Sequence, residues 1–129
     1  MRAARSGCAG IGEGPAFTTS QELAEQVTHE LAHQWLYLIE DIWPLDLPGA
    51  ARLTLPSGTG DRAPAEVLGA AHVAAALCRM YAACGGPGAG ERASALTAYG
   101  RGCLELAQAA SADLTEAGTT IAQRLKEAL

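Results

Sequence analysis

Apolar side chains recur at helical spacing over the first part of the chain. Thr19 and Glu22 have the spacing of a capping box, which predicts that a helix begins near residue 19. Pro44 and Pro48 are expected to end this helix, because proline cannot continue one. Between these limits, three- and four-residue steps connect the apolar positions Leu23, Ala24, Val27, Leu31, Trp35, Leu38, Ile39 and Ile42.

Three further helices are predicted after a long loop. Residues 44–64 are rich in proline and glycine and predict irregular structure with a short extended piece at 53–55. A second helix is expected from Pro64 to about residue 83, and its almost wholly apolar sequence predicts a central position in the fold. Further helices are expected at about 91–110 and 115–128, separated by "SADLT" at 111–115.

This order of elements predicts an all-α fold, a small bundle of about four helices with a long Pro/Gly-rich loop between the first two. The Gly-rich residues 1–17 lack periodicity and are expected to form a flexible N-terminal segment, followed by one helical domain at 18–129. A length of 129 residues suits one such domain.

Composition excludes some function classes. A formal net charge of −5 without a basic stripe argues against nucleic-acid binding. No apolar run reaches the roughly 18 residues of a membrane span, and the N-terminus lacks the apolar core of a signal peptide. We therefore expect a cytoplasmic protein without a membrane partner.

The stretch "THELAHQW" at 28–35 contains the pattern His-Glu-x-x-His. His29 and His33 are one helical turn apart, so they can reach the same metal ion. Glu30 is offset by about 100° and can reach a metal-bound water, as in zinc peptidases. The alternative is a chance match, in which each histidine needs its own hydrogen-bond partner.

A third metal ligand has to come from beyond the first helix. Glu40 shares a face with His33 but lies about 10 Å further along a straight helix. The remaining candidates are Asp46 in the loop and Glu66 and His72 in the second helix. Glu66 and His72 are six residues apart and face different sides of a helix, so we expect only one of them to bind.

"HELAHQW" resembles the motif helix of the gluzincin aminopeptidases. The resemblance implies a carboxylate ligand nineteen positions after the second histidine. That position is Arg52 in this chain, so the resemblance ends after eight residues.

A longer resemblance begins near residue 18. The stretches that carry it are "LAEQVTHELAHQWLYLIEDI", a Pro-rich loop, "RAPAEVLGAAHVAAALCRMY" and the ending "LTEAGTTIAQRLKEAL". In this order and spacing they resemble the C-terminal part of the HExxH-motif peptide-modification proteins. These proteins accompany precursor peptides of ribosomally made, modified natural products, mainly in actinobacteria.

This resemblance implies non-haem Fe(II) and 2-oxoglutarate as cofactors, and β-hydroxylation of a precursor peptide as the reaction. It implies that His29 and His33 bind iron, with His72 as the third ligand and Glu66 as the alternative. A cationic side chain should bind the distal carboxylate of the cosubstrate. Arg79 is the first candidate, and Arg52 and Arg62 in the loop are the alternatives. Family members usually have more sequence before the motif helix. This chain is therefore expected to be a fragment (the C-terminal part of a larger family domain), a sequence with a mis-called start, or a minimal domain that a homo-oligomer or a partner chain completes.

Two other function classes remain open at this point. One is a zinc metallopeptidase with Zn(II) in place of iron and Glu30 as the general base. The other is a non-catalytic helical module that binds a peptide or partner. The two-histidine motif alone does not distinguish iron from zinc.

Overall fold

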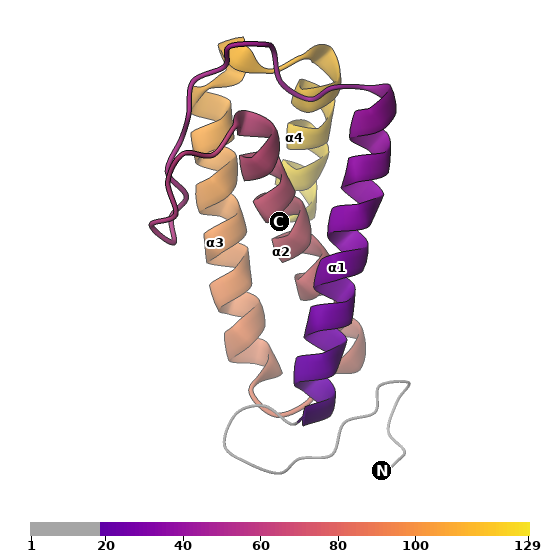
Figure 1. The fold of residues 1–129 in the computed structure, drawn as a ribbon. Helices are drawn as coiled ribbons and strands as arrows, with labels where there is room; N and C mark the ends of the chain where they lie inside the picture. The colour runs from indigo at the N-terminus through magenta and orange to yellow at the C-terminus, as the bar shows by residue number, and fades with distance from the viewer. Residues whose placement is uncertain (1–18) are drawn as a thin grey trace.

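The computed structural model describes residues 19–129, which contain four α-helices and one short 3-10 helix joined by loops (Figure 1). The segment 1–17, predicted to be flexible, lies outside the described residues. The helices are α1 (Thr19–Ile42), α2 (Pro64–Cys84), α3 (Ala89–Ala109) and α4 (Glu116–Ala128), with the 3-10 helix η1 (Ser111–Asp113) before α4. The predicted all-α bundle is confirmed.

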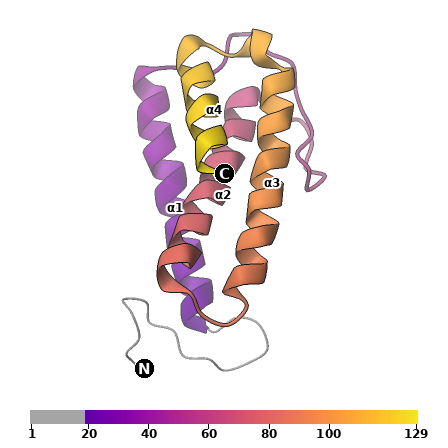
Figure 2. The same cartoon turned by 180° about the vertical axis from the view of Figure 1, so that it is seen from behind.

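Helix α2 occupies the centre of the bundle, as its apolar sequence predicts. It packs against each of the other three helices, whereas α1 packs chiefly against α2 alone. In Figure 1, α1 and α3 stand on either side of α2, and Figure 2 shows α4 covering the upper part of α2 from behind. On the opposite side, no helix of residues 19–129 covers the face between α1 and α3 (Figure 1).

Small side chains allow the helices to approach α2 closely. Ala71 and Ala75 are buried beside Leu68, and Leu104 of α3 belongs to the same cluster. A Cβ atom added to Gly100 of α3 would lie 3.1 Å from the Cβ of Ala74, so this contact depends on glycine. Burial of large apolar groups in this cluster supplies the main stabilisation of the fold.

Judged by length and composition alone, helix α2 is long and apolar enough to span a membrane. Half of the apolar window lies buried inside the bundle. The central helix of a soluble protein passes the same test, so this feature agrees with the role of α2 as the core helix.

The long loop crosses the top of the bundle and is tied to the segment before α4. Leu45 is almost fully buried, and its carbonyl accepts a hydrogen bond from the Thr115 backbone N–H at 3.0 Å. Further along, Leu53 and Arg62 form an isolated antiparallel bridge within the loop itself. The loop is irregular as predicted, and this bridge begins in the predicted extended piece at 53–55.

The apolar periodicity that predicts α1 does not mark its buried face. Toward α2 the helix buries Ala32 and Leu36, with Ile39 partly buried. Most of the larger apolar side chains of α1 point to solvent, because α2 is its one substantial neighbour. The exposed apolar side chains on the outward side are Leu23, Val27, Leu31, Trp35, Leu38 and Ile42.

Gly118 provides a test of how closely α4 contacts the loop. A Cβ atom at this position would collide with the carbonyl oxygen of Leu45. We expect Gly118→Ala to lower the free energy of unfolding by about 2–3 kcal/mol, because the backbone of the loop must move. Gly90→Ala in α3 is the matched control, since its Cβ would meet open space. It should leave stability unchanged or raise it by about 0.5 kcal/mol, as read by urea denaturation. Equal stability of both variants would contradict the packing described for α4.

Candidate functional site

A cleft opens on the uncovered face of the bundle, with α1 and α3 as walls and α2 as floor. Its volume is about 880 Å³, within the range of small-molecule and cofactor sites. Small residues of α2 such as Gly69, Ala70 and Val73 form the floor, and loop residues including Ser57 and Thr59 also line it.

The wall formed by α1 is mostly polar. It carries Glu25, His29, His33, Tyr37 and Glu40, which follow one another at three- and four-residue steps and therefore share one face of the helix. The ring of His33 stacks on that of Tyr37, with 5.7 Å between ring centroids. The predicted motif helix thus presents both motif histidines to the cleft.

His29 and His33 lie together as predicted. Their Nε2 atoms are 3.1 Å apart, and their ring centroids are separated by 4.8 Å. Partial burial and the neighbouring His29 both lower the pKa of His33, which favours its neutral form. A neutral imidazole nitrogen is the form that binds a metal ion.

Glu30, the predicted catalytic residue, points in a different direction from His29 and His33. Its side chain is exposed, and it is not among the residues that line the cleft. Its charge raises the pKa of His33 against the larger effects that lower it, so it acts on His33 through electrostatics.

His72, the predicted third ligand, lies where α2 packs on α1 and does not line the cleft. Its ring hydrogen-bonds to the Ala32 backbone, and burial lowers its pKa. Its Nε2 atom is the one buried side-chain N or O atom without a hydrogen-bond partner in the described residues. A buried nitrogen without a hydrogen-bond partner costs free energy.

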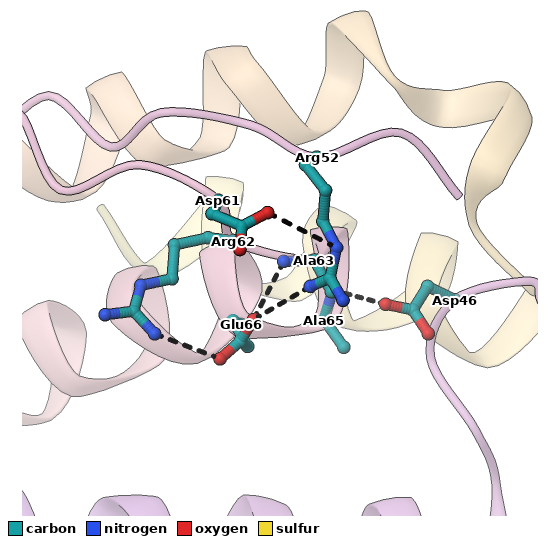
Figure 3. A network of polar contacts seen from close by, with 7 residues as sticks. All are labelled: Asp46, Arg52, Asp61, Arg62, Ala63, Ala65 and Glu66. Atoms are coloured by element: carbon teal, nitrogen blue, oxygen red, sulfur yellow. Dashed lines mark hydrogen bonds and ion pairs between the residues drawn. The ribbon is translucent and has the colours of Figure 1, made fainter. Parts of the chain in front are cut away.

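The two carboxylates proposed as alternative ligands cap α2 (Figure 3). Asp46 accepts a hydrogen bond from the Ala65 N–H at 2.9 Å, and Glu66 accepts one from the Ala63 N–H at 2.8 Å. Negative charge at a helix N-terminus is favourable, because the first N–H groups have no partner within the helix. Of the two carboxylates, only Glu66 also lines the cleft.

Arginine side chains hold Glu66 in this position. Arg62 lies 3.4 Å and Arg52 3.6 Å from its carboxylate oxygens, and Arg52 also approaches Asp61 at 3.8 Å (Figure 3). All these side chains are substantially exposed, so each pair contributes little stability. Within residues 19–129, no three His, Cys, Asp or Glu side chains are grouped closely enough to hold a metal ion.

The predicted cosubstrate arginine, Arg79, is exposed on α2 and is not part of the cleft lining. Arg62, which the sequence leaves as an alternative, does line the cleft, as does Arg92 of α3. The sequence gives no sign of the role of Arg92, because its partner lies 67 positions away.

That partner is Glu25, one turn before His29. Arg92 binds its carboxylate through two hydrogen bonds, of 2.7 Å and 3.1 Å, and Tyr81 donates a third of 2.6 Å. The guanidinium of Arg92 lowers the pKa of Glu25, against the opposing effect of burial. This triad joins α1, α2 and α3 at one end of the cleft and so fixes the helix that carries the histidines.

The other end of the cleft is acidic. Burial raises the pKa of Glu40, and the neighbouring charges of Asp46, Asp41 and Glu66 raise it further. Glu40 and Glu66 both line the cleft here. The two ends therefore differ, with a neutralised ion pair at one and an excess of carboxylates at the other.

No protein-family model matches the chain, and no curated protein matches it significantly.

The Glu25 triad predicts how stability depends on pH. The pKa of Glu25 lies below its usual value of 4.5 in the folded protein, so its contribution is present above pH 4.5 and lost as pH falls through the lowered pKa. Glu25→Gln should therefore cost about 1–2 kcal/mol at pH 7 and less at pH 3, because Arg92 loses a charged acceptor.

Urea denaturation at both pH values measures this difference, with Glu105→Gln on the exposed side of α3 as the matched control. The control should have the same free energy of unfolding as the wild type at both pH values. An equal cost of Glu25→Gln at pH 7 and pH 3 would contradict the assigned role of the ion pair.

Proposed function

We propose that the protein is a metal-dependent enzyme that modifies a peptide, and that His29 and His33 supply two of the metal ligands at the cleft. The observation that carries the proposal is the 3.1 Å separation of the two Nε2 atoms. Two imidazole nitrogens this close together on one helix face could bind the same ion.

The same separation is that of a hydrogen bond, in which one ring donates a proton to the other. Metal binding would displace this proton and would require both rings to turn their Nε2 lone pairs toward the ion. The two histidines would supply two ligands to one ion. The described residues contain no group of three His, Cys, Asp or Glu side chains close enough to bind it without a rearrangement. The buried, unpaired Nε2 of His72 supports this residue as the third ligand, reached after a change in side-chain position.

Fe(II) with 2-oxoglutarate is the cofactor set we propose, because the long resemblance of the sequence to the HExxH-motif peptide-modification proteins implies it. When bound, this set supplies the oxidising power to hydroxylate a peptide β-carbon. The Glu25–Arg92–Tyr81 triad would hold α1 in place, and the small residues of the α2 floor would leave room for substrate. Arg62 suits the cosubstrate carboxylate better than Arg79, because it lines the cleft.

Metal binding is the first test of this proposal. The wild-type protein should bind one equivalent of Fe(II) or Co(II) by anaerobic titration, and His29→Ala or His33→Ala should weaken binding by more than about 100-fold. Gln26→Ala, an exposed residue of α1, is the matched control and should bind as the wild type does. His72→Ala tests the third ligand, and a loss of affinity in this variant would assign it. Unchanged metal content in His29→Ala would favour the non-catalytic module.

The reaction is tested separately. Anaerobic addition of 2-oxoglutarate to the Fe(II)-loaded protein should produce a weak visible charge-transfer band, and air should then add one oxygen atom to a bound precursor peptide. Arg62→Gln should weaken 2-oxoglutarate binding, whereas Arg79→Gln should not. Peptide cleavage by the zinc-loaded protein, lost in Glu30→Gln, would instead support the metallopeptidase.

A further inference from the structure

The outward side of α1 carries a continuous apolar stripe that no element of the described chain covers. We call it the outer stripe, and its six members expose between 49% and 66% of their surface. They are Leu23, Val27, Leu31, Trp35, Leu38 and Ile42. This stripe runs along nearly the whole helix.

The stripe is large enough for a stable interface. Six side chains of this size and exposure present on the order of 700 Å² of mostly apolar surface, more than the largest patch on most monomers. Each partner in a standard protein–protein interface contributes about 800 Å². Burial of the stripe together with its polar rim would reach this value.

The flanking charges argue against a membrane as the occupant. Helix α1 contains no lysine or arginine, and Glu30 and Asp41 are exposed beside the stripe. Helices that lie on membranes carry basic residues on the polar face, which anionic lipids attract.

We propose that the outer stripe pairs with the same stripe of a second copy, with the two α1 helices antiparallel. The steps between successive members are 4, 4, 4, 3 and 4 residues, so the stripe has nearly the same spacing from either end. A two-fold axis near residues 32 and 33 therefore places Leu23 against Ile42 and Val27 against Leu38. A symmetric interface requires this self-complementarity.

The polar rim is compatible with the antiparallel arrangement. A two-fold axis perpendicular to two antiparallel helices brings the same flank of each copy together. Glu30 of one copy then lies near Gln34 of the other, so this carboxylate meets an amide donor.

The dimer leaves the cleft open. The centre of the stripe lies about 160° around α1 from the residues that line the cleft, as 100° per residue requires. Each copy would therefore keep its own His29–His33 pair accessible. The interface is independent of the proposed metal and of the proposed reaction.

Analytical ultracentrifugation in EDTA tests the proposal, because the chelator removes any metal bridge between exposed histidines. At about 100 µM the wild-type chain should sediment at twice the mass of one chain. Leu31→Lys and Leu31→Glu should each be monomeric, and an equimolar mixture should recover the dimer, because position 31 lies close to the two-fold axis. Gln108→Lys, exposed on α3, is the control and should remain dimeric.

Circular dichroism should show unchanged helix content in each Leu31 variant, since this side chain is 65% exposed. Leu38→Lys provides a second variant at another point of the stripe and should also be monomeric. A monomeric wild type at this concentration would overturn the proposal. So would a dimer that survives all of these substitutions.

Discussion

The close packing of three helices on α2 is the constraint on which the rest of the structure depends. Alanine and glycine along α2 and α3 bring the backbones near to each other, as the contact between Gly100 and Ala74 shows. This packing fills the core with few large side chains, because short distances between helices leave little volume to fill. It also uses nearly every face of α2, so α2 is the one helix that is apolar on all sides.

The position of α1 follows from this constraint. Among the described elements, helix α1 packs on α2 and touches α3 chiefly through the Glu25–Arg92 ion pair, which leaves two of its faces largely uncovered. One of these faces is polar and forms the wall of the cleft with His29 and His33, and the other is the apolar outer stripe. The same helix thus carries the candidate metal ligands and the candidate interface, on faces that do not interfere with each other.

Charged groups stabilise the two ends of the cleft in different ways. Carboxylates of Asp46 and Glu66 satisfy the first N–H groups of α2, which positions the start of the floor. At the opposite end, Glu25 receives hydrogen bonds from Arg92 and Tyr81 and so joins three helices. A site between them would have walls held by directional contacts, which is what a reaction that depends on orientation needs.

The sequence by itself determined the helices and the pairing of the motif histidines, because both depend on the periodicity of one helix. The steps of apolar residues and the positions of proline and glycine were enough to place all four helices within a few residues. The tertiary structure alone decided which apolar face of α1 is buried, that Glu25 pairs with Arg92, and that Glu66 is held at a helix end. These facts depend on contacts between residues far apart in the chain. The periodicity of one helix does not determine which neighbouring element covers each of its faces.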